Sequence, residues 1–352
     1  MGYVFEDAFV KGVAVGMFLM LLIKLTLELF SFSKRDIYDL QHWKLNIRLP
    51  LGSLWMNLGY WKDGGNVSSQ FFSDACTALL HEVLYTSGIL SRGGKAGDVH
   101  RVEESVAILD LGFGCGDQTC ELVRLSLDEL IPGLSYIGLT LNGVQAAAAS
   151  DKLGRQLAEV AAHPGENIGR DKIQVFRANA AQPQSWNQDV RLAIDAVKRD
   201  EGAKKWVLAL DTLYHFSPSR QPIFDYAAQD LETNIMAFDL LLNSEATFLN
   251  KLVVKVIGLL MGCPLNAFLT EEGYRNQLIT SGYDKEDIVV RDITENVFPG
   301  LVAFLERQEN ALRPYGISLG QLAVAKKVFG WFHRSKVLKA VIIVAKKDGQ
   351  ED

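Results

Sequence analysis

Apolar and polar residues alternate in blocks from about residue 100 onward, and the blocks predict strands and helices in turn. Short apolar runs predict buried strands, and the longer amphipathic stretches between them predict helices. The predicted strands cover residues 106–111, 135–140, 172–178, 206–211, 234–242, 287–293 and 339–347. The predicted helices cover residues 117–131, 142–162, 219–231, 271–282, 294–313 and part of 314–338. This alternation predicts an α/β fold with a mostly parallel, seven-stranded sheet that carries helices on both faces.

One apolar stretch interrupts this alternation. Residues 248–263 read FLNKLVVKVIGLLMGC, with Lys251 and Lys255 as the only charges, and Pro264 ends the stretch. It is too short and too interrupted to predict a membrane span. Two interpretations remain open: a lid or membrane-facing insertion at about residues 244–270, and an ordinary core helix.

The N-terminal part of the chain is strongly apolar. Residues 12–23 (GVAVGMFLMLLI) carry no charge, and KLTLELF extends the run to Phe30. The pattern fits a tilted membrane-spanning anchor, an amphipathic helix in the membrane surface, or a helix packed on the protein itself. No small-residue cleavage site comes after it, which argues against a signal peptide. We expect residues 1–34 to associate with a membrane, and SKRD after the run favours a cytosolic location for the rest of the chain.

Charge and cysteine usage narrow the possible partners. The formal net charge is −6, and the sequence has no basic stripe with interleaved aromatics, so we expect no nucleic-acid binding. The four cysteines and six histidines show neither metal-ligand spacing nor a disulfide framework. We therefore expect no metal and a reducing compartment.

The first predicted strand ends in an acidic residue and runs into a glycine-rich turn. The sequence ILDLGFGCGDQT places Asp110 before Gly112, Gly114 and Gly116, and a predicted helix comes next. Glycines allow the backbone to turn sharply and approach a ligand closely, and the helix N-terminus supplies free N–H groups. A dinucleotide site would show G-x-G-x-x-G and an acidic residue at the end of the second strand. Both are missing, since that strand ends at Thr140, which argues against NAD.

ILDLGFGCGDQT resembles motif I of class I S-adenosylmethionine-dependent methyltransferases. A second segment, YIGLTLNGVQAAAA at 136–149, resembles the G-[IVL]-T-L-S-x-x-Q segment of a subgroup that contains cyclopropane fatty acid synthases, tocopherol methyltransferases and sterol C24-methyltransferases. The resemblance implies a Rossmann-like fold and S-adenosylmethionine as the cofactor. It also implies that Thr140, Leu141 and Gln145 replace the usual ribose-binding acid, with Asn142 in place of the common Ser.

Two further stretches extend the resemblance. VFRANAAQPQSW, at 175–186, places Asn179 and Ala180 where the family contacts adenine, and Trp186 either stacks on the adenine or is an ordinary buried indole. WMNLGYW, at 55–61, resembles the N-[ML]-G-Y-W stretch in which an aromatic folds over cofactor and substrate, which makes Tyr60 and Trp61 candidates. The implied cofactor-binding residues are Tyr60, Trp61, Asp110, Gly112, Gly114, Gly116, Gln118, Thr140, Leu141, Gln145, Asn179 and Ala180.

ALDTLYHF, at 209–216, supplies the implied catalytic residues. Asp211 ends the fourth predicted strand, and His215 lies four residues later. A histidine of near-neutral pKa can accept the proton of a hydroxyl or amine acceptor; the alternative is that His215 only hydrogen-bonds the adjoining loop. Tyr214 is predicted to orient the acceptor or to stabilise a cation through its ring. Cyclopropane synthases carry Glu where Tyr214 stands, which argues against cyclopropanation, and MNLGYWKDGG replaces the Y-E-x-G-W-G segment of sterol enzymes.

These features predict three parts: a membrane-associating helix at 1–34, a helical extension at 35–100, and a Rossmann-like methyltransferase domain at 101–352. The predicted function is S-adenosylmethionine-dependent methyl transfer to a lipophilic small molecule at a membrane surface. The alternative is a non-catalytic protein of the same fold that binds the cofactor or a partner. Acceptor, oligomeric state and the choice among O-, N- and C-methylation remain open.

Overall fold

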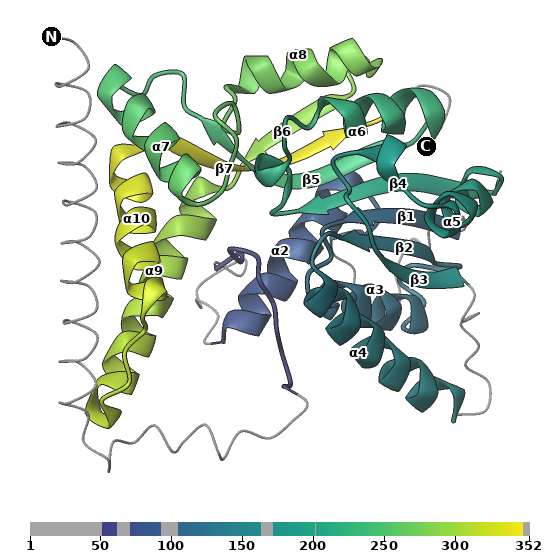
Figure 1. The fold of residues 1–352 in the computed structure, drawn as a ribbon, viewed down its shortest axis with the longest axis horizontal. Helices are drawn as coiled ribbons and strands as arrows, with labels where there is room; N and C mark the ends of the chain where they lie inside the picture. Colours follow the sequence, from purple (N-terminus) through teal and green to yellow (C-terminus); the bar gives the residue numbers. More distant parts are fainter. Residues whose placement is uncertain (1–50, 62–70, 93–104, 163–171, 201, 348–352) are drawn as a thin grey trace, which may run out of the picture.

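A seven-stranded sheet forms the centre of the protein, in the order β3-β2-β1-β4-β5-β7-β6 (Figure 1). The computed structural model describes residues 51–61, 71–92, 105–162, 172–200 and 202–347. The strands are β1 (Ser105–Leu111), β2 (Ser135–Thr140), β3 (Ile173–Arg177), β4 (Ala203–Leu210), β5 (Asn234–Leu242), β6 (Ile288–Asp292) and β7 (Leu338–Ala345). Neighbouring strands are parallel except at β7, which is antiparallel to both β5 and β6. The predicted mostly parallel sheet of seven strands is confirmed.

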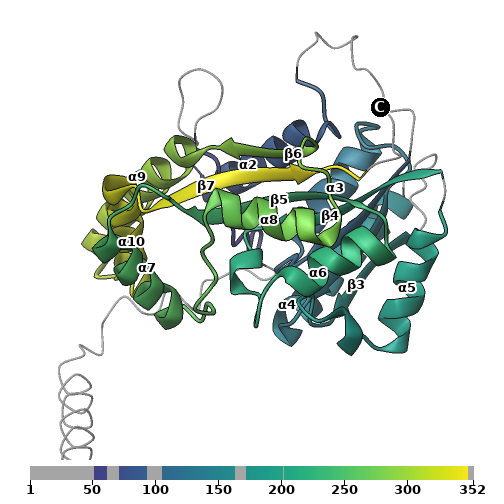
Figure 2. The ribbon, with the colours of Figure 1, turned by 90° about the horizontal axis from the view of Figure 1, so that it is seen from above.

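Helices cover both faces of the sheet, and successive side chains of each strand enter two different cores. In β1, Val106 and Ile108 belong to one core, and Ala107 and Leu109 to the other. The helices of the first face are α2 (Phe72–Ser87), α3 (Asp117–Leu127), α4 (Gly143–Ala161), α9 (Thr294–Leu312) and α10 (Gln321–Ser335). Those of the second are α5 (Gln188–Lys198), α6 (Gln221–Asp225) and α8 (Glu271–Ser281). Figure 2 shows α2 and α8 on opposite faces, which explains why the strands read as continuous apolar runs.

Three helical segments differ from their predictions. The helix predicted over 117–131 ends at Leu127, because the chain leaves helical geometry and Glu129 adopts a φ of 58°. The segment predicted as one helix over 219–231 is divided into α6 and a π-helical turn at Tyr226–Asp230. Helix α5 was missed, although its buried residues, Val190, Ala193, Ile194 and Val197, show helical spacing.

The apolar insertion forms helix α7 (Phe248–Leu260). Of its residues only Val254 and Gly258 are buried, so the core-helix interpretation is wrong. No helix in the described part of the chain has the length and apolarity needed to cross a membrane. The predicted membrane-associating helix at residues 1–34 lies outside the described residues.

Candidate functional site

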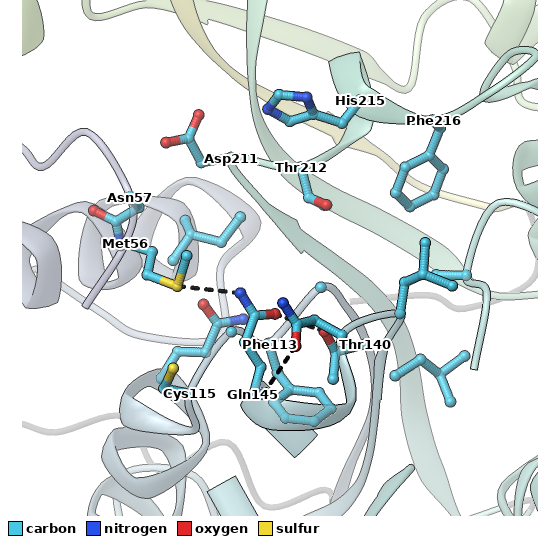
Figure 3. Close-up of a pocket in the computed structure, with 18 of the residues that line it drawn as sticks. Met56, Asn57, Phe113, Cys115, Thr140, Gln145, Asp211, Thr212, His215 and Phe216 are labelled. Carbon is cyan, nitrogen blue, oxygen red and sulfur yellow. Dashed lines mark hydrogen bonds between the residues drawn. The ribbon is translucent and has the colours of Figure 1, made fainter. Parts of the chain in front are cut away.

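A cavity of about 540 Å³ opens at the carboxyl ends of β1, β2 and β4 (Figure 3). The glycine turn after β1 and the residues after β2 form one side, and the segment 210–217 after β4 forms the opposite side. Residues 54–58 of the segment 51–61 line it as well. Open α/β sheets bind ligands at this edge, and residues from five separate stretches of sequence meet here.

The three glycines of the turn adopt left-handed backbone geometry for different reasons. A Cβ on Gly112 would lie 2.6 Å from Oγ1 of Thr212, and one on Gly116 would lie 2.8 Å from Cβ of Ala149. These two glycines allow close packing against the segment after β4 and against α4. Gly114, with φ +63°, differs because its added Cβ would meet only Met56 Sδ, at 3.6 Å. Its backbone faces the cavity, which is the close approach that a ligand requires.

Asp110 does not line the cavity, which corrects the prediction that it faces the ligand. Its carboxylate is completely buried beneath the turn and accepts hydrogen bonds from Gln118 Nε2, at 2.8 and 2.7 Å, and from Tyr136 OH, at 2.7 Å. Burial raises the pKa of Asp110 to about 7, although both donors oppose this shift. Gln118 does line the cavity, so Asp110 fixes a cavity residue instead of contacting a ligand itself.

The end of β2 brings the predicted ribose-binding residues together. Thr140 Oγ1 donates to Gln145 Oε1 at 2.9 Å, and Leu141 lines the cavity beside them. Asn142 caps α4 by accepting hydrogen bonds from the backbone N–H groups of residues 144 and 145. Gln145 Nε2 also contacts Met56 Sδ at 3.4 Å, across the cavity edge (Figure 3). These side chains offer hydroxyl and amide groups in a position where a dinucleotide site would offer a carboxylate.

Asn179 and Ala180 line the cavity after β3, as predicted. Asn179 Oδ1 accepts from the backbone N–H of Ala181 at 3.1 Å, and its carbonyl accepts from Trp186 Nε1 at 2.8 Å. Trp186 is 4% exposed and packs edge-on against Tyr226, outside the cavity. The buried-indole interpretation of Trp186 is therefore correct, and the indole holds the loop that presents Asn179.

Tyr60 and Trp61 lie outside the cavity, which corrects their prediction as cofactor-binding residues. Gly59 adopts a φ of +74°, and the chain beyond it pairs with Ala75 and Asn296 through the backbone N–H groups of Tyr60 and Trp61. The Trp61 ring is buried against aromatic side chains of α2 and α9. The residues of this segment that line the cavity are instead Leu54, Trp55, Met56, Asn57 and Leu58. The motif identified the correct segment but the wrong side chains.

Asp211 joins the segment 51–61 to the end of β4. Its Oδ2 accepts from the backbone N–H of Leu58 at 3.0 Å, and its Oδ1 accepts from Tyr214 OH at 2.7 Å. Asp211 has a φ of 64°, an uncommon value for a residue other than glycine that is found often at functional sites. Burial, with a smaller contribution from the charge of Asp239, raises the pKa of Asp211 to about 7.

Tyr214 and His215 lie together on a single 3₁₀ turn after Asp211. Their ring centroids lie 4.4 Å apart, and both residues line the cavity. His215 Nδ1 lies 3.5 Å from Sγ of Cys263, a contact between residues 48 positions apart that no motif predicts. Partial desolvation lowers the pKa of His215, which favours the neutral imidazole that is able to accept a proton. The three predicted catalytic residues therefore form one cluster.

No group of three or more His, Cys, Asp or Glu residues within the described ranges could hold a metal ion. The cavity instead offers amide and hydroxyl groups beside the glycine turn and β2, carboxyl and imidazole groups on the opposite side after β4, and the aromatic and thioether side chains of Trp55, Phe216, Met261 and Phe329. This distribution suits a ligand with a polar part and an acceptor with an apolar part.

Solved S-adenosylmethionine-dependent methyltransferases share this fold. A cyclopropane synthase from Mycobacterium tuberculosis is 14% identical, with a TM-score of 0.52 over 83% of this chain and 90% of that chain. A mycolic acid cyclopropane synthase, solved with S-adenosylhomocysteine and CTAB, is 12% identical, with a TM-score of 0.54 over 82% and 89%. Phosphoethanolamine N-methyltransferase 2 from Haemonchus contortus, solved with S-adenosyl-L-methionine, is 13% identical, with a TM-score of 0.51 over 81% and 61%. The chain thus has the class I methyltransferase fold. Its sequence matches no family model and no curated protein.

Proposed function

We propose that this protein transfers a methyl group from S-adenosylmethionine to a lipophilic small molecule. The observation that carries the proposal is the convergence, on one cavity, of the open Gly114 turn with the Asp211, Tyr214 and His215 cluster. Solved proteins of this fold bind S-adenosylmethionine or S-adenosylhomocysteine, which supports the choice of cofactor.

The residues present fit this cofactor. The Gly114 backbone leaves room for close approach, and Gln118, Thr140, Gln145 and Asn179 offer polar groups along the same side of the cavity. When bound, S-adenosylmethionine supplies an electrophilic methyl group on a positively charged sulfur. These side chains would hold its adenosine and amino acid parts.

The opposite side of the cavity supplies what an acceptor needs. Neutral His215 can take the proton that a hydroxyl or amine acceptor loses as its bond to the methyl carbon forms. Tyr214 keeps its proton, because burial and the neighbouring Asp211 raise its pKa well above the usual value, so it donates to Asp211. Asp211 in turn holds Leu58 over the site. The rate would come largely from this positioning, since the sulfide leaves without protonation.

Two variants test cofactor and chemistry separately. Gly114→Val should weaken S-adenosylhomocysteine binding about a hundredfold in calorimetry, since it adds strain and fills the approach. Gly316→Val is the matched control, because Gly316 has nearly the same φ, +64°, with nothing within 4 Å of an added Cβ. His215→Asn should keep this binding and lower turnover with a lipid extract about a hundredfold or more.

Absence of cofactor binding in the unmodified protein would refute the proposal. Binding without turnover for any lipid fraction would favour the non-catalytic alternative.

The proposal that residues 1–34 hold the domain on the cytosolic side of a membrane rests on their sequence.

A further inference from the structure

Helix α7 exposes an apolar surface that the rest of the described chain does not cover. Its exposed apolar residues, together called the α7 face, are Phe248, Leu249, Leu252, Val253, Val256, Leu259 and Leu260. At 100° per residue they fall within an arc of about 140°. Phe248 and Leu260, at the two ends of the helix, are each 83% exposed. So many large apolar side chains on one exposed surface indicate an interaction site.

The other side of α7 is anchored to the protein. Val254 is completely buried, and Gly258 packs so closely that an added Cβ would lie 2.8 Å from the Phe268 ring. The loop after α7 is held by Arg220, which pairs with buried Asp239 at 2.6 Å and also donates to the carbonyl of Ala267. The α7 face is therefore presented by a fixed helix.

The charges of α7 favour an anionic surface as the occupant. Exposed Lys255 borders one edge of the α7 face, Lys251 beside it donates to the Ser244 carbonyl at 2.7 Å, and the helix contains no acidic residue. This local excess of two positive charges contrasts with the net charge of −6 for the chain. Lysine side chains at the edge of an apolar face reach lipid headgroups while the apolar residues enter the acyl region.

The α7 face ends beside a residue that lines the cavity. Met261 comes directly after α7, is 48% exposed and lines the cavity together with Phe329 of α10. Figures 1 and 2 both place α7 beside α10, at the end of the molecule farthest from β3. An acceptor dissolved in a bilayer under α7 would meet Met261 before it met His215.

We propose that α7 is an interfacial helix that lies in the surface of an anionic bilayer and admits a lipid-dissolved acceptor to the cavity past Met261. The membrane contact stands on α7 alone, whereas the admission of an acceptor rests on the proposed function. A second copy of the chain and a segment of this chain outside the described residues are the competing occupants.

The test uses the full chain with Leu260→Cys labelled by an environment-sensitive nitrobenzoxadiazole dye. Vesicles of phosphatidylcholine and phosphatidylserine should shift the emission to shorter wavelength, and pure phosphatidylcholine vesicles should do so less. Leu192→Cys on α5, also exposed, is the matched control and should not respond. Labelled unsubstituted protein gives the contribution of the native cysteines. Adding Lys255→Glu should raise the vesicle concentration needed for the response about tenfold, whereas Lys285→Glu, on a distant loop, should not.

Three outcomes would overturn the inference. No change at position 260 with anionic vesicles means that α7 does not enter the bilayer. A short-wavelength emission before vesicles are added means that protein already covers α7. If this emission does not depend on protein concentration, the covering segment belongs to the same chain; if it does, a second copy covers α7. Calorimetry with S-adenosylhomocysteine on the same labelled protein reports on the proposed function independently, so the two failures are distinguishable.

Discussion

A fully buried and a partly buried carboxyl group lie at the carboxyl ends of adjacent strands, and they have different roles. Asp110 in β1 and Asp211 after β4 both have a pKa raised by burial to about 7. Asp110 is enclosed by Gln118 and Tyr136 and does not line the cavity, whereas Asp211 lines the cavity and accepts from Leu58 N–H and Tyr214 OH. A pKa raised to about 7 is therefore found both at Asp110, which has a structural role, and at Asp211, which belongs to the site.

The strand register explains the difference. Asp110 pairs with Leu208, so Asp211 lies three residues farther toward the carboxyl edge of the sheet. At 3.3 Å per residue this is about 10 Å, enough to move a side chain from beneath the glycine turn to the cavity. A raised pKa alone thus does not identify a functional residue. The position of the residue along its strand must also be considered.

The largest expected effect is on stability, at Asp110. Asp110→Ala removes the buried acceptor of Gln118 Nε2, leaves Tyr136 OH with only Thr119 Oγ1 as a partner, and opens a small void. We expect the free energy of unfolding to fall by about 4 kcal/mol, measured by urea denaturation. A stable Asp110→Ala protein that has lost only turnover would reverse the roles assigned to the two carboxyls.

Asp211→Asn tests the other side of the comparison. Asparagine tolerates the left-handed backbone at this position but cannot accept from both Leu58 N–H and Tyr214 OH. We expect turnover to fall between about tenfold and a hundredfold while the affinity for S-adenosylhomocysteine changes little. A weakened affinity with unchanged turnover would place Asp211 on the cofactor side.

The pH dependence should make the two carboxyls alike in stability and different in function. In the folded protein each carboxyl has a pKa of about 7, whereas in the unfolded chain its pKa is near 4. Between these values folding takes up a proton, so the free energy of unfolding falls as the pH rises toward 7. Between pH 5 and 8 the unfolding free energy of the unmodified protein should fall by on the order of 2 kcal/mol relative to that of Asp110→Asn, and by a similar amount relative to that of Asp211→Asn. Only Asp211→Asn should also change the pH profile of turnover. Equal profiles for both variants would remove the functional distinction.

Much of this arrangement was predictable, because local patterns determine it. The glycine turn, the Asn142 cap and the succession of strands along the chain depend on short stretches whose periodicity and turn chemistry are visible in the sequence. The positions of Tyr60 and Trp61 were not predictable, because one positive φ at Gly59 directs the chain away from the cavity. The enclosure of Asp110 depends on β1–β4 register and on Tyr136, which comes from another strand.

The His215 environment also escaped prediction, because Cys263 belongs to the loop after α7. The apolar run at 248–263 leaves a lid or membrane-facing insertion and a core helix as alternatives, and it does not indicate which residues are exposed. The side of α7 that is buried is selected by Phe268 and the Arg220 contact to the loop, both tertiary features.

The smallest expected effect concerns Cys263, which connects the loop after α7 to the cluster of Asp211, Tyr214 and His215 after β4. Burial, with the charge of Asp239, raises the pKa of Cys263 to about 11, so the thiol stays protonated and acts on His215 only as a weak hydrogen-bond partner. When His215 Nδ1 carries the proton and faces Sγ, its other nitrogen is free to act as the base. Cys263→Ala should therefore lower kcat about threefold to tenfold at unchanged cofactor affinity, and Cys263→Ser should restore most of it.

Cys120→Ala is the control, because Cys120 lies on α3 and does not line the cavity. Equal kcat values for the Ala and Ser variants at position 263 would show that the hydrogen bond does not position His215. In that case Asp211 and Tyr214 would organise the site after β4 without help from Cys263. The segment after α7 would then contribute only Met261 to the cavity lining.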